Sequence, residues 1–286
     1  MYKELAYYDG QIGTPQEVMI PFNDRSHFCG DGVYEATIGG NHVAYLLEDH
    51  LDRFYTSANY FNINIPMTKT ELGQLITDLL QQVEGDTHFV YWQVTRGVAA
   101  REHAYGSGME GKIWVWIRPS KAGDPREELK LIVRPDTRFL HGNAKTLNLL
   151  PAVMGADEAA RLGVNECVLH RDGFVTECCH SNIQILQKGM LITHPDDQYI
   201  LRGIAKTHMT EACRRLGITV IERPFTLEEL YDADEVLVTA SARMCQHAVE
   251  IEGKKVGGKD PETLARIEKE VIAEYLKYTG RKTLLD

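Results

Sequence analysis

The sequence predicts an α+β fold in two domains. Segments rich in β-branched and aromatic residues alternate with amphipathic stretches, in an order that suggests hairpins and separate helices rather than a doubly wound sheet. A polar stretch containing glycine and proline, 119–128, is the expected linker. With 286 residues, the chain is long enough to bury a sizeable core on each side of that linker.

The N-terminal domain, 1–118, is expected to contain several strands and two helices. Strands are predicted where β-branched or aromatic residues dominate, at 17–20, 33–38, 89–94 and 112–117. Helices are predicted at 49–60 and 70–83. The second of these has apolar residues at helical spacing, namely Leu72, Leu75, Ile76, Leu79 and Leu80.

The C-terminal domain, 129–286, is expected to open with a strand at 129–133. The elements predicted next are a helix at 152–162, a hairpin around 171–173, a strand at 182–186 and a helix at 204–216. A long amphipathic helix at 260–279 closes the chain. Its first turn contains Pro261, where a proline is tolerated because that amide would have no partner.

The overall charge argues against some classes of partner. Lysine and arginine total 31 and aspartate and glutamate 41, a net charge of −10 that disfavours nucleic acid and anionic membranes. No apolar run approaches the roughly 18 residues of a membrane span, and the N-terminus lacks a signal-peptide core. The six cysteines show no C-x-x-C spacing, so we expect a reduced, cytoplasmic protein.

Lys145 stands at the start of an apolar run, in Asn143-Ala144-Lys145-Thr146-Leu147-Asn148-Leu149-Leu150. A buried ammonium is costly unless it is paired or neutralised, and such lysines form Schiff bases. Glu177 follows after a further thirty-two residues. A carboxylate there could pair with the protonated ring nitrogen of pyridoxal 5′-phosphate (PLP) held by the lysine. By itself the pair is a weak signal, because most lysines followed by a distant glutamate lie on the surface.

The segments around these two residues resemble those of the class IV (fold-type IV) PLP aminotransferases. The matching segments are 138–150, Thr176-Glu177, Ser181-Asn182, Gly30-Asp31-Gly32-Val33-Tyr34-Glu35, His50-Leu51-Asp52-Arg53 and Leu201-Arg202-Gly203-Ile204. They occur in the family's order and spacing, from near residue 5 to about residue 255. The resemblance implies a small N-terminal α/β domain, a larger C-terminal domain with a barrel-like sheet, and a homodimer.

The resemblance also implies which residues hold the cofactor. Lys145 would carry PLP, Glu177 would pair with its ring nitrogen, and Arg53 would bind its phosphate. Gly203 opens a predicted helix, whose first amides and dipole favour an anion. On the sequence alone, this segment could equally be an ordinary helix start after a turn.

Two further residues of the helix start and one loop residue complete the implied phosphate site. Ile204 and Ala205 would donate their amides, and Ser241 would donate its hydroxyl. Ala240 replaces a residue that often carries a hydroxyl in the family, so one donor is expected to be absent. Arg138 is expected behind the cofactor.

A substrate carboxylate site is implied by Tyr34, Arg101 and His103. The segment Arg101-Glu102-His103 resembles the Arg-x-His of D-amino acid transaminases, in which a neighbouring subunit contributes the loop. An arginine fork binds a carboxylate through two hydrogen bonds, and tyrosine and histidine add donors. Without the resemblance, the segment would be interpreted as a polar loop after a strand.

One segment departs from the family pattern. Cys178-Cys179-His180 stands where glycine or small hydroxylated residues are common, which affects the expected pocket more than the cofactor site. Adjacent cysteines have poor spacing for metal ligands, so no metal site is expected. His180 could be a hydrogen-bonding partner behind the pocket or could narrow it.

The function implied is a ping-pong transamination from D-alanine or similar D-amino acids to 2-oxoglutarate, with amino acids and 2-oxo acids as the small-molecule partners. A branched-chain L-amino acid aminotransferase is the first alternative. An (R)-amine transaminase and an aminodeoxychorismate lyase share the same scaffold. A PLP-binding protein without turnover is the remaining alternative, disfavoured by Lys145, Glu177 and Arg101-x-His103.

Overall fold

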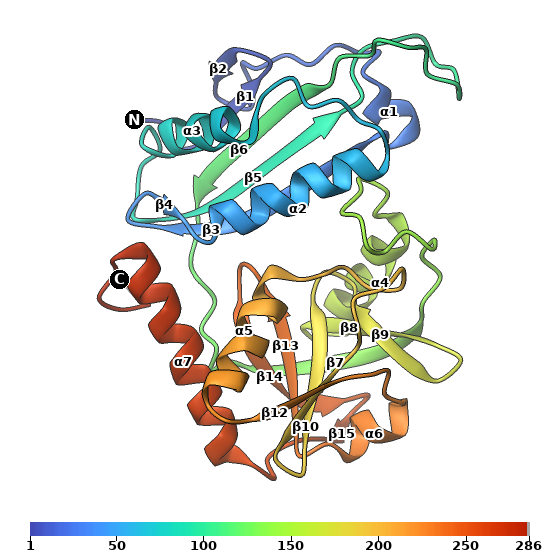
Figure 1. The fold of residues 1–286 in the computed structure, drawn as a ribbon, viewed down its shortest axis with the longest axis vertical. Coiled ribbons are helices and arrows are strands. Elements are labelled where there is room, and N and C mark those ends of the chain that lie inside the picture. The colour runs from blue at the N-terminus through green and yellow to red at the C-terminus, as the bar shows by residue number, and fades with distance from the viewer. Residues whose placement is uncertain (285–286) are drawn as a thin grey trace. The chain divides into compact units, whose positions relative to one another are not determined.

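The computed structural model describes residues 1–284, which form two compact units (Figure 1). Unit 1 comprises Met1–Ala122, Ala144–Asn148 and the described residues from Leu276 onward. Unit 2 comprises Gly123–Asn143 and Leu149–Tyr275. These units do not test the domain limits predicted from sequence, 1–118, 119–128 and 129–286, which stay a prediction. No helix within residues 1–284 is long and apolar enough to cross a membrane.

Unit 1 is built on a six-stranded antiparallel sheet in the order β2-β1-β6-β5-β3-β4. Its elements are β1 Leu5–Tyr8, β2 Gln11–Gly13, α1 Arg25–Cys29, β3 Gly32–Gly40, β4 Val43–Ala44, α2 Leu47–Tyr60, α3 Lys69–Leu80, β5 Thr87–Thr95 and β6 Lys112–Pro119. Helices α2 and α3 cover one face of this sheet (Figure 1). The core of the unit lies between that face and the two helices.

Local sequence explains why these elements form. Thr68 caps α3 and forms a capping box with Glu71, which satisfies amides at the helix start. The apolar face of α3 is buried at Leu72, Ile76 and Leu79. The alternation of inward and outward side chains along the central strands buries one set against that face.

The strand predicted at 17–20 is wrong. The segment is a turn, because the amides of Glu17 and Val18 both donate to the carbonyl of Thr14. The Glu17 carboxylate in turn accepts from the amide and hydroxyl of Thr14, each at 2.9 Å. Pro15 and Pro21 flank the segment and cannot donate to a ladder, so β-branched composition alone did not make a strand.

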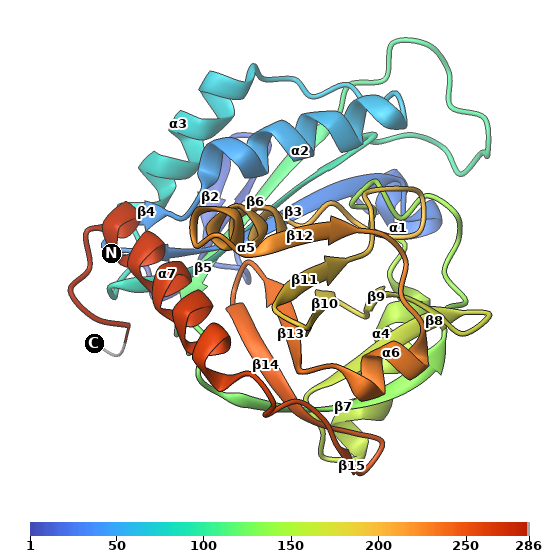
Figure 2. The same cartoon turned by 60° about the horizontal axis from the view of Figure 1, so that its bottom comes forward.

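Unit 2 contains a nine-stranded sheet in the order β12-β11-β10-β13-β14-β7-β8-β9, with β15 paired to β14. Its elements are β7 Glu128–Pro135, α4 Leu150–Arg161, β8 Glu166–Arg171, β9 Phe174–Cys178, β10 Asn182–Gln187, β11 Met190–Thr193, α5 Ile204–Arg215, β12 Thr219–Glu222, α6 Leu227–Asp232, β13 Glu235–Ala240, β14 Met244–Ile251 and β15 Lys254–Lys255. Helix α7, Pro261–Thr279, belongs to unit 2 up to Tyr275 and to unit 1 from Leu276. Parallel and antiparallel pairs are mixed. Figure 2 shows that the sheet curls, which confirms the barrel-like sheet that was expected.

The remaining predicted elements are confirmed within one to three residues. They are the strands at 33–38, 89–94, 112–117, 129–133 and 182–186, the helices at 49–60, 70–83, 152–162, 204–216 and 260–279, and the hairpin at 171–173. Several short strands, β1, β2, β4 and β15 among them, were not predicted. They contain two to four residues, too few for a periodic pattern to be visible in the sequence.

Candidate active site

The segment that carries Lys145 is docked on the start of β3. Thr146 forms an antiparallel bridge with Val33, and the Lys145 carbonyl accepts a 2.9 Å hydrogen bond from the Tyr34 amide. The Lys145 amide donates to the Ser57 hydroxyl of α2 at 3.2 Å. The backbone of the lysine is therefore fixed on both sides, by a strand and by a helix.

Gly32 permits this docking because it has no side chain. A Cβ atom at this position would lie 2.6 Å from Leu147 Cδ1 and 2.6 Å from the carbonyl oxygen of Val94. Val94 belongs to the neighbouring strand β5, so its carbonyl cannot move away without disturbing the sheet. The glycine in this part of the sequence therefore has a packing role beside the lysine.

The Lys145 amine lies against an aromatic face. The side chain is half-buried, and Nζ is 4.3 Å from the centroid of the Tyr34 ring. Tyr34 stacks on Tyr91 with centroids 5.5 Å apart, and the Tyr91 hydroxyl donates to Gln93 at 2.7 Å. No carboxylate among the described residues of unit 1 forms an ion pair with Lys145. An amine that is not locked in an ion pair can act as a nucleophile once it is deprotonated.

Glu35, Arg53 and His50 form a buried ionic group in unit 1. Glu35 faces the core from β3 and has no exposed surface. Arg53 donates to it through Nε at 2.6 Å and Nη2 at 2.8 Å, and His50 Nδ1 lies 2.6 Å from the same carboxylate. Arg53 and His50 are one turn apart on α2, so both reach the strand from one helix face.

The charges in this group are fixed by their contacts. Burial by itself raises the pKa of Glu35, but the Arg53 guanidinium and His50 outweigh it and lower the pKa to about 2. Burial lowers the pKa of His50, so its ring is neutral at pH 7. Arg53 is thereby held by an ionised carboxylate. Its predicted contact with a phosphate stays a prediction.

Arg101 and His103 lie in the long loop between β5 and β6 (Figure 1). Both residues are exposed, and their side chains form no hydrogen bond or ion pair with the part of unit 1 that the structure describes. The arrangement leaves both side chains able to bind a small anion. The predicted carboxylate site of Tyr34, Arg101 and His103 is not tested by the structure and stays a prediction.

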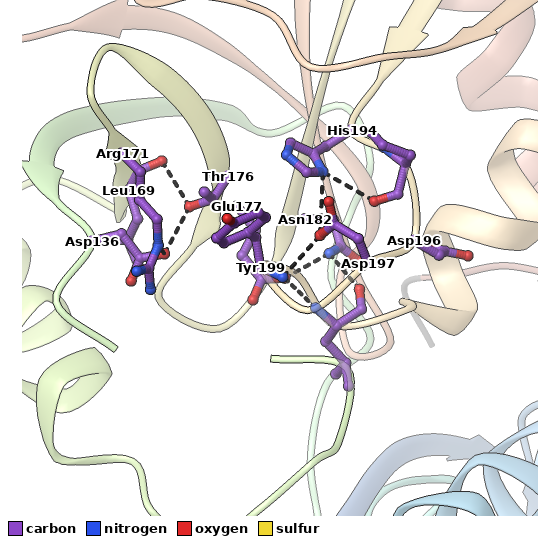
Figure 3. A network of polar contacts seen from close by, with 12 residues as sticks. Asp136, Leu169, Arg171, Thr176, Glu177, Asn182, His194, Asp196, Asp197 and Tyr199 are labelled. Atoms are coloured by element: carbon purple, nitrogen blue, oxygen red, sulfur yellow. Dashed lines mark hydrogen bonds and ion pairs between the residues drawn. The ribbon is translucent and has the colours of Figure 1, made fainter. Parts of the chain in front are cut away.

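In unit 2, Glu177 is a nearly buried carboxylate with three donors. Arg138 Nη1 lies 2.5 Å from Oε1, while Asn182 Nδ2 and the Leu201 amide donate to Oε2 at 2.8 and 3.1 Å. Figure 3 shows the Asn182 side chain directed at Glu177. Donors of this kind favour the ionised carboxylate, which is the form that a protonated ring nitrogen needs.

Arg138 is held by a second carboxylate as well. Its Nη2 lies 2.9 Å from Asp136, which also accepts from the Thr176 hydroxyl at 3.0 Å. Burial alone would lower the pKa of Arg138, but Asp136 and Glu177 raise it overall, so the guanidinium stays charged. Arg138, which is expected behind the cofactor, therefore has a definite partner in this unit, the carboxylate of Glu177.

The start of α5 has amides that no side chain caps. Gly203 caps the helix without a side-chain hydrogen bond, and the amides of Ile204 and Ala205 have no hydrogen-bond partner in residues 1–284. The helix dipole adds partial positive charge there. A Cβ atom on Gly203 would lie 1.9 Å from Asn182 Oδ1, so the glycine is required for the close approach of Asn182. Ser241 lies half-buried in the turn after β13.

The unusual Cys178-Cys179-His180 segment has a separate set of partners. Both cysteines are buried, while His180 is exposed and its Nδ1 lies 2.8 Å from Glu166. Burial raises the pKa of Glu166, but His180 and other donors lower it overall, so the pair is ionic when His180 is protonated. No group of three or more potential metal ligands gathers in the part of the chain that the structure describes.

Sequence reasoning missed the roles of Glu35, His50 and Asn182. A signal for Glu35 was present, because Val33 and Glu35 share a strand face and a core-facing carboxylate needs a cation. His50 and Arg53 at helical spacing supplied the partners. No local pattern marked Asn182, because its two acceptors come from different segments, Glu177 from β9 and the Leu201 carbonyl from the stretch before α5.

The chemical groups of each unit fit PLP. Unit 1 supplies the Lys145 amine on a fixed backbone. Unit 2 supplies the ionised Glu177 carboxylate and the uncapped amides of Ile204 and Ala205. An amine, a carboxylate for the ring nitrogen and donors for a phosphate are the groups that this cofactor requires.

Comparison with known proteins points to one family. Residues 32–251 match the family described as amino-transferase class IV. The chain is 30% identical over 261 residues to the D-alanine aminotransferase of Bacillus licheniformis, covering 91% of this chain and 92% of that protein. It is 32% identical over 275 residues to the D-alanine aminotransferase of Listeria monocytogenes, covering 93% and 94%.

Solved structures agree in fold. The branched-chain amino acid aminotransferase of Escherichia coli has a TM-score of 0.85 at 20% identity, covering 94% of this chain and 93% of that chain. Sequence identity at this level supports the fold and does not identify a substrate.

Proposed function

The chain belongs to the class IV aminotransferase family, and we propose that within this family it is a D-amino acid transaminase. Class IV aminotransferases depend on PLP and act on amino acids and 2-oxo acids. The proposed reaction moves the amino group of D-alanine to 2-oxoglutarate in two half-reactions, giving pyruvate and D-glutamate. The observation that carries the proposal is Arg101-x-His103, exposed in a loop of a chain whose curated relatives are D-alanine aminotransferases.

Lys145, Glu177 and the phosphate donors would hold the cofactor. Lys145 would bind it covalently through Nζ, and the ionised Glu177 would keep the ring nitrogen protonated. The amides of Ile204 and Ala205, with Arg53 and Ser241, bind the phosphate. When bound, PLP supplies an electron-withdrawing ring that stabilises the charge left on the substrate Cα.

The reacting proton is handled by Lys145. When its Nζ is free, the amine would take the Cα proton of the bound substrate and hold it on one face of the substrate. The backbone contacts of Lys145 with Tyr34 and Ser57 keep this amine in place. The aromatic face of Tyr34, 4.3 Å from Nζ, excludes water from one side of it.

The substrate carboxylate would be bound by Tyr34, Arg101 and His103. The Arg101 fork matches the two carboxylate oxygens, and the tyrosine hydroxyl and histidine ring add donors. Anchoring the carboxylate determines which face of Cα meets Lys145, so the same three residues select the D-enantiomer. In this proposal, the loop of one subunit serves the site of its neighbour, which requires a homodimer.

The first experiment follows the yellow colour of the PLP-loaded enzyme after adding single amino donors. D-Alanine should bleach the band and 2-oxoglutarate should restore it, while L-leucine and (R)-1-phenylethylamine should have little effect. A response to L-leucine alone would instead assign a branched-chain aminotransferase, the activity named for the solved structure of similar fold. Bleaching by none of the three would point to a lyase or a binder without turnover.

The shared site is tested by mixing two inactive variants. Lys145→Ala and Arg101→Ala should each lose at least about 10³-fold in activity, because one lacks the base and the other the carboxylate fork. If each site combines residues of two subunits, refolding the variants together restores up to about a quarter of the activity in mixed dimers. Absence of any restoration would place the whole site within one chain.

A further inference from the structure

The loop 97–111, which joins β5 and β6, is fixed at its base by a buried arginine of α1. Arg25 is 3% exposed, and its Nη1 donates to the carbonyl oxygen of Glu102 at 2.7 Å. Its own amide donates to the carbonyl of Gly97 at 3.0 Å. Arg25 therefore contacts the loop at its first residue and again at Glu102, between Arg101 and His103.

The short helix that begins with Arg25 is held firmly by hydrogen bonds of Asp24. Asp24 caps α1 by accepting from the Ser26 amide at 2.9 Å and, through its other oxygen, from the Thr95 hydroxyl at 2.8 Å. Thr95 ends β5, and Asp24 and Thr95 are both buried. The short helix is thus attached directly to the central sheet, so the Arg25 guanidinium has little freedom to move.

The two arginines around Asp31 explain why Arg25 also donates to the Glu102 carbonyl. Asp31 faces two guanidinium groups, with Arg25 Nε at 2.7 Å and Arg96 Nε at 2.9 Å. One carboxylate cannot satisfy all donors of two buried arginines, so backbone carbonyls supply the remainder. Arg96 donates to the carbonyls of Asn62 and Phe61 at 2.8 and 2.9 Å, and Arg25 donates to that of Glu102.

The far part of the loop is held by Arg96, the second arginine that pairs with Asp31. The ring of Tyr105 lies over the Arg96 guanidinium, 3.6 Å from its centre, although Tyr105 is 44% exposed. The stretch from Arg101 to Tyr105 is thereby held at two points, the Glu102 carbonyl and the Tyr105 ring. Among the described residues of unit 1, the side chains of Arg101 and His103 have no side-chain partners, so their placement depends on the contacts of the loop backbone.

We propose that Arg25 is a positioning residue for substrate carboxylate recognition. Through Asp31 and the Glu102 carbonyl, it holds the backbone between Arg101 and His103 in the shape that lets both bind one carboxylate. This inference rests on the proposed function of those two residues. Its energetic basis is the ordering of the loop before the substrate arrives, which removes part of the entropic cost of binding.

The test compares Arg25→Gln with wild-type enzyme in single turnovers with D-alanine, following the loss of the yellow band. The apparent dissociation constant for D-alanine should rise about tenfold or more, the effect of losing one or two charge-assisted hydrogen bonds. The limiting rate at saturation should change less than about threefold, because Lys145 is untouched. Binding of PLP should be unchanged.

Arg118→Gln is the matched control, and Arg25→Lys is the graded variant. Arg118 lies over the Phe89 and Trp116 rings of the same sheet and contacts no part of the loop, so its loss should leave D-alanine binding near wild type. A lysine at position 25 keeps the charge but cannot reach both Asp31 and the Glu102 carbonyl, so its effect should be intermediate.

Hydrogen exchange of peptides from 97–111 gives a readout that does not depend on activity. Arg25→Gln should accelerate exchange in this loop and leave the peptides of α2 unchanged. Unchanged D-alanine binding in Arg25→Gln or Arg25→Lys, with unchanged exchange, would overturn the inference while the proposed function stands. If wild-type enzyme does not respond to D-alanine, the proposed function fails, and loop exchange alone decides whether Arg25 positions this segment.

Discussion

Glu35 and Glu177 are both buried carboxylates held by an arginine, yet they differ in what surrounds them. Glu35 lies inside unit 1, and its partners Arg53 and His50 come from one helix packed on its own strand. Glu177 lies near the end of β9, and its three donors come from three separate stretches of chain. The first carboxylate is part of the core, whereas the second lies at a strand end and is held by two loops and the start of β10.

We therefore expect Glu35 and Glu177 to have different roles. A carboxylate in the core fixes a helix to a sheet, and its loss is a loss of stability. A carboxylate assembled by loops at a strand end can face a ligand, and its loss is a loss of chemistry. Four measurements can break or sharpen this distinction.

The largest effect is expected from Glu177→Gln. The amide keeps the shape of the side chain but cannot keep a ring nitrogen protonated, so kcat should fall about 10³-fold. Unfolding in urea should change little, because Asp136 still pairs with Arg138. Retention of more than about a tenth of the activity would remove Glu177 from the catalytic group.

Glu35→Gln should act on stability instead. It leaves the Arg53 guanidinium buried without its counter-ion, which typically costs about 4 kcal/mol, read from urea unfolding at pH 7. Glu48→Gln is the control on α2, the helix that carries Arg53, because Glu48 forms an exposed pair with Lys69 and should change stability little. A stable Glu35→Gln protein with reduced activity would reverse the roles that we assign.

Lowering the pH should reduce the free energy of unfolding through protonation of Glu35. Its pKa falls from 4.5 in the unfolded chain to about 2 in the folded state, so the folded state is favoured above pH 4.5. That contribution, about 3 kcal/mol, is lost as the pH falls from 4.5 to 2. His50, whose pKa is lowered by burial, adds a loss in the same direction below its ordinary value of 6.5. Urea unfolding at several pH values should show a shallower decline in Glu35→Gln.

The smallest effect is expected from Asn182→Ala. It removes hydrogen bonds to Glu177 and to the Leu201 carbonyl but leaves Arg138 and the Leu201 amide in place. Stability should fall by about 1 kcal/mol, and PLP should bind a few-fold more weakly. Equilibrium dialysis with PLP measures the second effect. A loss of PLP binding far larger than a few-fold would make Asn182 a primary ligand.

Much of the site was visible in the sequence because its chemistry is carried by short motifs. Lys145, Glu177 and the Gly203-Ile204 helix start were predicted from residue type and from resemblance, and the structure gives each a definite local environment. The long helices and most of the long strands were predicted for a similar reason, since a periodic pattern over eight or more residues is local information, but β14 was not predicted.

The sequence by itself determined the family, the cofactor and the main elements. It did not show that residues 17–20 form no strand. There the Thr14 amide donates to the Glu17 side chain instead of to a neighbouring strand. It also did not indicate that Arg25 reaches Glu102, 77 residues away, or that Glu35 pairs with Arg53. Such pairs depend on which buried charges face each other after the chain folds. Buried charges must find partners wherever the backbone places them, so only the tertiary structure decides those contacts.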